Sequence, residues 1–188
     1  MMTMSLAGVG RPFSVADLEA MPDDGRRYEL IDGELLVTPA PGWAHQEASI
    51  TLTELLRAAC PRDLRVLIAP FAVRPDMHNE LQPDVLVARF ADLTLKNLPK
   101  PPVLAVEVAS PSSRLTDANL KRAVYARMGV QTFWLVDPDP EQPSLTAFEL
   151  AAADYPQVAH VVGDQAFTAE RPFVVRIMPA ELVRGLQP

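Results

Sequence analysis

Glu107 is an acidic residue inside an apolar, strand-like segment, VLAVEVAS, at residues 103–110. Side chains alternate between the two faces of a strand, so Glu107 shares one face with Val103 and Ala105, while Val108 belongs to the other face. Both faces are apolar, and an ionised carboxylate buried without a partner is strongly unfavourable. The pattern therefore predicts that a cation, a proton or a metal ion accompanies Glu107.

A second acidic residue, Asp84, opens the apolar segment PDVLVARF at residues 83–90. If the two predicted strands are neighbours in one sheet, Asp84 and Glu107 converge at one edge. Two close carboxylates repel each other unless a proton or a cation lies between them. Carboxylate oxygens suit a hard ion such as Mg²⁺, which takes one or two carboxylates together with water and substrate phosphate. The pair therefore indicates metal-assisted phosphodiester chemistry.

Lys121 belongs to a helix that we predict at residues 116–128, and it lies one position from a stripe formed by Leu120, Val124 and Met128. An ammonium group in this place can flank the sheet instead of pointing into bulk solvent. It could orient a metal-bound water and offset the charge that develops on a phosphate. Two carboxylates and one lysine together are typical of a phosphodiesterase site.

Each of these residues also has a purely structural interpretation. Lys121 can form an ordinary helical ion pair with Asp117, and Asp84 can serve as a turn residue. Glu107 can lie half exposed on an edge strand and pair with an Arg or Lys. The SPSS segment at 110–113 more commonly ends a strand and caps a helix than binds phosphate.

The elements that must position these residues follow from hydrophobic periodicity and turn signals. The chain opens with a short helix capped by Ser14 and with a hairpin around Asp32 and Gly33. The predicted fold class is α+β (mixed α/β), with a central mixed sheet flanked by helices and with β-hairpins at both ends. Helices are expected at 43–60, 116–128 and 179–186, and strands at 64–75, 83–90, 102–109, 130–138, 144–150, 157–162 and 172–177.

Length and composition narrow the class of protein. The 188 residues suit one domain, 1–188, with a core that needs no disulfides. A single cysteine, Cys60, excludes an internal disulfide, and no apolar run approaches the roughly 18 residues of a membrane span. We therefore expect a cytoplasmic protein without a membrane anchor. The net charge of -7 argues against a surface that binds nucleic acid throughout, but it allows a local basic rim.

An ordered set of motifs resembles the Uma2 family, a group of bacterial proteins described as candidate restriction endonucleases within the PD-(D/E)XK nuclease superfamily. The resemblance covers about residues 11–186 and implies a restriction-endonuclease-like fold. The motifs are YELIDGEL (28–35), His45, PDVLV (83–87), VEVASPSS (106–113), Asp117, Lys121, Tyr125, GV (129–130) and FWLVDP (133–138).

The resemblance implies roles for individual residues. Asp84 and Glu107 would bind Mg²⁺ or Mn²⁺, with the backbone carbonyl of Ala109 as a possible further ligand. The superfamily pattern places a lysine at position 109, where this chain has alanine, and Lys121 would supply that charge from the helix. Three further residues match family positions near the expected cleft and are candidates for supporting roles: Glu29, Glu34 and His45.

These features together predict a Mg²⁺-dependent DNA endonuclease, with sequence specificity from the loops around 71–80 and 89–101 or from a partner. A homodimer would supply two sites for the two strands of DNA. The alternative is a catalytically inactive protein that keeps the nuclease fold for binding or regulation, and the acidic net charge favours it. Glycoside hydrolysis by paired carboxylates fits poorly, since it needs neither the lysine nor a set of oxygen ligands for a metal.

Overall fold

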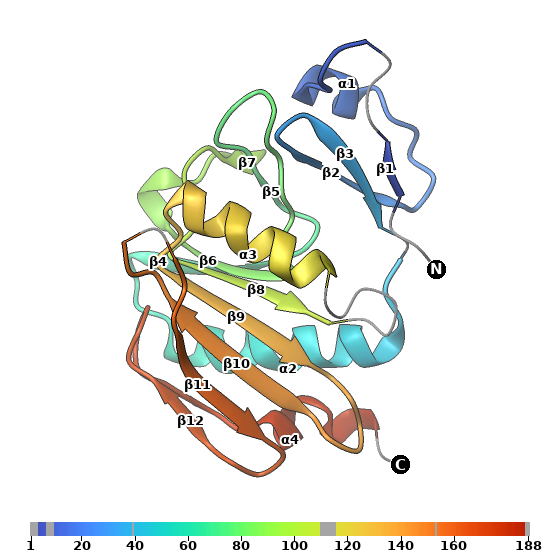
Figure 1. Ribbon diagram of the computed structural model, residues 1–188. Helices are drawn as coiled ribbons and strands as arrows, with labels where there is room; N and C mark the ends of the chain where they lie inside the picture. Colours follow the sequence, from blue (N-terminus) through green and yellow to red (C-terminus); the bar gives the residue numbers. More distant parts are fainter. Residues whose placement is uncertain (1–3, 7–9, 39, 110–115, 153, 187–188) are drawn as a thin grey trace.

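A six-stranded mixed sheet lies at the centre of the protein (Figure 1). The computed structural model describes residues 4–6, 10–38, 40–109, 116–152 and 154–186. The strand order is β11-β10-β9-β8-β6-β4, in which β8 and β9 are parallel and the other neighbouring pairs are antiparallel. This arrangement confirms the predicted α+β class. The strands are β4 (Leu64–Ile68), β6 (Val85–Arg89), β8 (Leu104–Val108), β9 (Thr132–Asp137), β10 (Ser144–Glu149) and β11 (Gln157–Val162).

Helices cover both faces of this sheet (Figure 1). On one face, α2 (Trp43–Ala59) packs through apolar residues such as Leu52 into the largest core cluster. On the other face, α3 (Thr116–Met128) contributes Val124 to a second cluster that is rich in aromatic residues. Glu107 projects from β8 toward α3, as its hydrogen bonds to that helix show. The sheet therefore presents its acidic residues on the α3 side.

A smaller sheet precedes the central one in the chain. Its strand order is β1-β3-β2, and the short helix α1 packs beside it (Figure 1). Ser14 occupies the N-cap position of α1 as predicted, and the Asp17 side chain accepts hydrogen bonds from its backbone N–H and its hydroxyl. The elements are β1 (Met4–Leu6), α1 (Val15–Glu19), β2 (Arg27–Ile31) and β3 (Glu34–Thr38).

The turn between β2 and β3 is the Asp-Gly hairpin that the sequence predicts. Asp32 and Gly33 have φ angles of 52° and 78°, the left-handed pair that a two-residue type I′ turn requires. A Cβ atom added at Gly33 would lie 2.5 Å from the Cβ of Pro12. Glycine at position 33 is therefore required by the backbone conformation and by the packing of the preceding segment.

Strand β2 is tied on its other side to the segment that leads into the central sheet. The Leu30 N–H donates to the Glu80 carbonyl at 2.7 Å, and the Glu80 N–H donates back to Leu30 at 3.0 Å. Arg27 and Glu29 lie on the face of β2 opposite to Leu30. Because the two bonds hold Leu30 beside Glu80, they also fix the positions of Arg27 and Glu29 relative to Asp84. The N-terminal hairpin is thereby placed over the end of β6.

The remaining elements complete the two ends of the fold. A hairpin at the C-terminal end of the chain, β12–β13, confirms the prediction of β-hairpins at both ends. The short strands β5 and β7 pair in parallel beside the central sheet. These elements are β5 (Ala72–Val73), η1 (Phe90–Asp92), β7 (Asn97–Leu98), β12 (Phe167–Ala169), β13 (Val175–Ile177), α4 (Pro179–Leu182) and η2 (Arg184–Leu186). Among the described residues, no helix has both the length and the apolar composition to span a membrane.

Three details of the prediction were wrong. Leu120 was placed on the buried stripe of its helix, but its side chain is 43% exposed, and Lys121 and Tyr125 are buried in its place. The predicted strand 64–75 divides into β4 and β5, because Pro70 lacks the N–H that an uninterrupted strand would need. The predicted strand 172–177 forms a strand over its last three residues, Val175–Ile177. The predicted cap at 110–113 and the side chain of Asp117 lie outside the described residues.

The core packing predicts a large difference between two leucine positions. Leu52 is fully buried in α2, whereas Leu95 is fully exposed. Replacing Leu52 with alanine should lower the free energy of unfolding by about 2–5 kcal/mol, because it removes buried methyl groups and leaves a cavity. Leu95→Ala is the control and should change stability by no more than about 0.5 kcal/mol. Urea unfolding followed by circular dichroism measures both, and equal losses would contradict the assigned core.

Candidate active site

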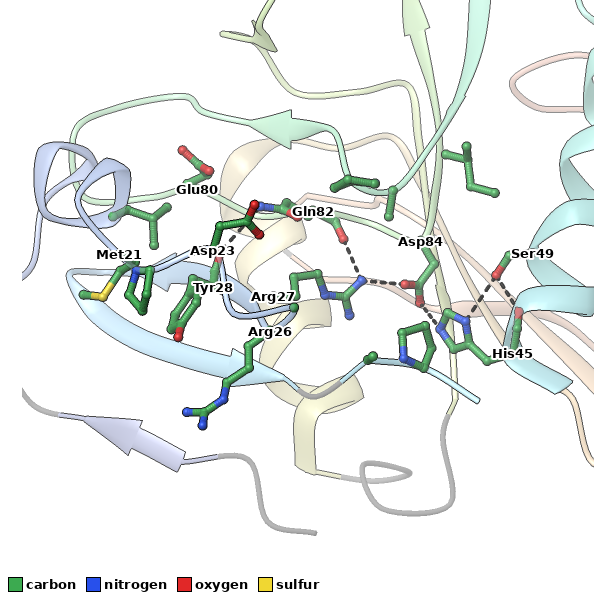
Figure 2. A pocket seen from close by; sticks show the side chains of 18 of the residues that line it. Met21, Asp23, Arg26, Arg27, Tyr28, His45, Ser49, Glu80, Gln82 and Asp84 are labelled. Atoms are coloured by element: carbon green, nitrogen blue, oxygen red, sulfur yellow. Dashed lines mark hydrogen bonds and ion pairs between the residues drawn. The ribbon is translucent and has the colours of Figure 1, made fainter. Parts of the chain in front are cut away.

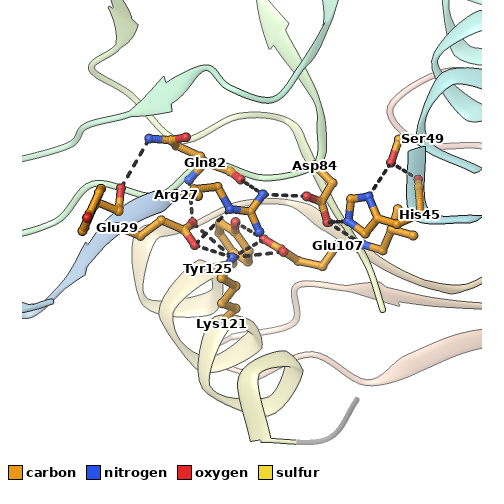
Figure 3. Close-up of polar contacts among 11 residues, drawn as sticks. Arg27, Glu29, His45, Ser49, Gln82, Asp84, Glu107, Lys121 and Tyr125 are labelled. Atoms are coloured by element: carbon orange, nitrogen blue, oxygen red, sulfur yellow. Dashed lines mark hydrogen bonds and ion pairs between the residues drawn. The ribbon is translucent and has the colours of Figure 1, made fainter. Parts of the chain in front are cut away.

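Asp84 and Glu107 lie side by side at one end of the central sheet. Strands β6 and β8 pair antiparallel with Val85 opposite Val106, so Asp84, directly before Val85, and Glu107, directly after Val106, come to the same edge. Both are buried, with exposed fractions of 2% and 7%. Figure 3 shows that side chains from β2, α2 and α3 converge on them.

Asp84 accepts hydrogen bonds on both carboxylate oxygens. Its Oδ1 receives Nη1 of Arg27 at 2.7 Å, and its Oδ2 receives the backbone N–H of Val108 at 2.8 Å and lies 3.1 Å from Nε2 of His45. Burial opposes ionisation, but the hydrogen bond with His45 and the charge of Arg27 outweigh it and hold the pKa of Asp84 well below its usual range. Asp84 is therefore an anion whose orientation is fixed from three directions.

Glu107 has a different environment, although it is a neighbour of Asp84. Lys121 Nζ donates to its two oxygens at 3.2 and 3.1 Å, and the Tyr125 hydroxyl donates to Oε1 at 2.7 Å. Burial raises the pKa of Glu107 to about 7. The charge of Lys121 opposes this shift, whereas the negative charges of Asp84 and Glu29 add to it. Glu107 therefore keeps its proton to a higher pH than an exposed glutamate does.

Lys121 connects Glu107 to Glu29, which is the third buried carboxylate of the site. Its Nζ lies 3.0 Å from Oε2 of Glu29 and donates to Oε1 at 3.1 Å. Burial disfavours the ammonium, but the charges of Glu107 and Glu29 outweigh that and raise the pKa of Lys121. The backbone N–H of Gln82 also donates to Oε1 of Glu29, whereas Oε2 receives no hydrogen bond among the described residues. Lys121 is thus a buried, charged bridge between two sheets.

Two residues of the site were missed by the sequence analysis. Arg27 was not considered, although it shares one face of β2 with Glu29, which was a candidate. Tyr125 was named only among the family motifs; it packs on Phe133 with ring centroids 5.6 Å apart, and its hydroxyl also binds Glu107. Its place four residues after Lys121, on the same helical face, was the available signal.

The other predicted residues divide between the site and its surroundings. His45, in the first turn of α2, binds Asp84, and Ser49 donates to its backbone carbonyl at 2.7 Å with the hydroxyl 3.5 Å from Nδ1. Glu34 opens β3 and is exposed, so it does not join the buried cluster. Ala109 is buried directly after β8, and its N–H donates to Val136 at 2.7 Å. That its carbonyl binds a metal stays a prediction.

A pocket of about 520 Å³ adjoins Asp84 (Figure 2). Arg27, His45 and Asp84 line one end of it, and residues of α1 and of the loop before β2 line the other end. The buried charge cluster is therefore accessible from solvent on the side of Asp84. The pocket reaches Asp84, whereas Glu107 and Lys121 lie behind it and are not among its lining residues.

The chain was compared with known proteins. The sequence pattern of the Uma2 family, described as "Putative restriction endonuclease", matches residues 15–179. No curated protein matches significantly. Among solved structures, a protein of Anabaena variabilis ATCC 29413, described as "a putative nuclease belonging to DUF820", superposes with a TM-score of 0.73 at 18% identity, covering 93% of this chain and 99% of that one. That likeness shows a shared fold, and the match over most of the sequence shows that this chain belongs to the Uma2 family.

Proposed function

We propose that this protein is a metal-dependent nuclease that hydrolyses phosphodiester bonds in DNA. The observation that carries the proposal is the burial of Asp84 and Glu107 side by side at adjacent strand ends, with Lys121 bound to Glu107. Membership of a family described as restriction endonucleases supports the same reaction class and suggests DNA as the substrate. The acidic net charge of -7 then requires that attraction for phosphate be local to the site.

The donor set of the site suits a divalent cation such as Mg²⁺ or Mn²⁺. From the described residues, Asp84 and Glu107 each accept three hydrogen bonds, and a carboxylate has about four lone-pair positions, so on this count each has room for one more partner. Among the described residues, the three carboxylates Glu29, Asp84 and Glu107 outnumber Arg27 and Lys121, the cations that pair with them. The described residues contain no group of three or more His, Cys, Asp or Glu placed to hold a metal. Water and substrate oxygens would complete the coordination, as is usual for Mg²⁺.

Asp84 and Glu107 would hold the ion, which when bound lowers the pKa of a water molecule and polarises the phosphodiester. Lys121 favours the ionised form of Glu107 and would offer an ammonium group close to the reacting phosphate. Arg27 and His45 fix the orientation of Asp84, and Arg27 can bind a phosphate oxygen with its remaining N–H groups. The chain thus supplies charge and orientation within a buried site.

A second candidate function is binding without catalysis. The hydrogen bonds of Arg27 and His45 to Asp84 favour it, because they already stabilise this carboxylate without a metal ion. In that case the buried charges would serve the stability of the fold alone. The two functions differ in whether the protein binds a divalent ion and cleaves DNA.

Loss of either carboxylate should abolish both metal binding and cleavage. Asp84→Asn and Glu107→Gln keep the size of each side chain and remove a charged metal ligand, so cleavage should fall by roughly 100-fold or more. Calorimetric titration of Mg²⁺ and Mn²⁺ and cleavage of plasmid and single-stranded DNA measure the two effects in one preparation.

Asp164→Asn is the matched control, because Asp164 is an exposed carboxylate outside the site. It should bind the metal and cleave DNA as the wild-type protein does. If the wild-type protein bound neither ion at millimolar concentration and cleaved no DNA, the nuclease proposal would fail. The second candidate function, binding without catalysis, would then be supported.

Lys121 should matter for stability through its two carboxylate partners. Lys121→Met leaves Glu29 and Glu107 buried without their shared cation, and we expect the free energy of unfolding to fall by roughly 3–5 kcal/mol. Adding Glu29→Gln removes one of the two uncompensated charges and should recover part of that loss. Urea unfolding of the metal-free variants measures the difference.

Lys100→Met is the control for Lys121, because Lys100 pairs with Asp92 at the surface and is 64% exposed. It should cost no more than about 1 kcal/mol. Equal losses at the two lysines would show that the buried network does not stabilise the fold. If the Lys121→Met/Glu29→Gln protein is folded but does not cleave DNA, Lys121 contributes to the reaction as well as to the stability of the fold.

A further inference from the structure

The pocket beside Asp84 has two chemically different ends (Figure 2). At the inner end, Arg27 and His45 flank the Asp84 carboxylate. At the outer end, Figure 2 shows Tyr28 near Met21, and both line the pocket. A ligand that spans the pocket therefore meets charged groups at one end and an apolar, partly aromatic wall at the other.

At the outer end the carboxylates that line the pocket, Glu19, Asp23 and Glu80, outnumber the cations Arg26 and Arg74. Arg74 lies 2.6 Å from Glu80 and 3.0 Å from Glu19, and both carboxylates line the pocket with it. Arg26 lies 3.3 Å from Asp24. An uncharged group is therefore preferred there over a phosphate. The ring of Tyr28 offers a surface on which a planar base can stack.

Arg27 makes the inner end suitable for a phosphate. Its side chain is 21% exposed, and among the described residues its hydrogen bonds to Asp84 and to the carbonyl of Gln82 both come from Nη1. A guanidinium has five N–H donors in a planar fork, so several remain for an anion. The same end holds Asp84, one of the two carboxylates that we assign to the metal ion, and a bound ion would also attract a phosphate.

The volume of the pocket limits what can enter. At about 520 Å³ it falls within the range of small-molecule sites, which run from about 300 to 1,000 Å³. A paired base is stacked inside the duplex, and it must leave the stack before it can enter such a pocket. A single unpaired nucleotide has a planar uncharged base and an anionic phosphate, and it matches the two ends of the pocket.

We infer that this pocket binds one unpaired nucleotide of the substrate, with its base against Tyr28 and Met21 and its phosphate beside Arg27 and Asp84. The inference rests on the proposed nuclease function, because it takes the ligand to be part of that substrate. The protein should therefore favour single-stranded or locally unpaired nucleic acid over a continuous duplex.

The test is a binding measurement on the full chain in EDTA, where no metal-dependent cleavage occurs. Fluorescence anisotropy would follow a labelled single strand of about 12 nucleotides and a blunt duplex of the same sequence. We expect the single strand to bind about ten-fold more tightly. Tyr28→Ala should weaken its binding by about five-fold or more, because a stacking surface is lost.

A matched pair of tryptophan substitutions tests the location. Ile68 lines the pocket and is 38% exposed on β4, whereas Val158 is 49% exposed on β11, the strand at the opposite edge of the sheet. Ile68→Trp should fill the pocket and weaken single-strand binding by about ten-fold, and Val158→Trp should leave it within about two-fold. If thermal unfolding shows that Ile68→Trp is not folded, Tyr28→Ala decides the question.

Binding of the duplex as tightly as the single strand, or single-strand binding that neither Ile68→Trp nor Tyr28→Ala reduces, would overturn the inference. The proposed nuclease function can fail separately. A protein that binds no metal and cleaves no DNA, but still prefers a single strand through this pocket, would keep the inferred nucleotide site as a binding site. A protein that cleaves duplex DNA equally well with Ile68→Trp would keep the nuclease function and lose the site.

Discussion

The buried ammonium group of Lys121 is the interaction on which the architecture of the site depends. It reaches from α3 to Glu107 on the central sheet and to Glu29 on the N-terminal sheet, so one cation joins three elements. Its loss would leave both carboxylates buried without this partner, and their charges in turn raise the pKa of Lys121. The position of α3 over the sheet and the docking of the N-terminal hairpin are therefore coupled to the charge state of the site.

The same network explains how two neighbouring carboxylates can have pKa values shifted in opposite directions. Asp84 has Arg27, His45 and a backbone N–H as partners and keeps a depressed pKa, whereas burial raises the pKa of Glu107 to about 7. The excess negative charge works against stability in the absence of a cation and attracts a cation when one is available. A site of this kind sacrifices some stability for function, which is the reverse of what an apolar core of the same size would do.

The sequence was sufficient for the parts of the site that depend on local periodicity. Strand alternation identified Glu107 as a buried acid, and the order of the apolar segments predicted that β6 and β8 would bring Asp84 beside it. It was not sufficient for Arg27, whose role depends on the pairing of Leu30 with Glu80 fifty residues away in the chain. Leu120 was wrongly assigned to the buried stripe of α3, because hydrophobic periodicity treats lysine as a surface residue. Lys121 is buried instead, because it pairs with the buried carboxylate of Glu107.

The N-terminal hairpin consequently has more than a structural role. Alternation along β2 directs Arg27 and Glu29 to the same side, where Arg27 meets Asp84 and Glu29 meets Lys121. The residues before β2 form the outer wall of the pocket, so one short segment provides both a part of the charge network and the surface that a substrate would contact. Because two backbone hydrogen bonds to Glu80 hold β2 in place, the geometry of the pocket and that of the carboxylates are set by the same contact. Substrate contact and charge balance therefore cannot vary independently in this protein.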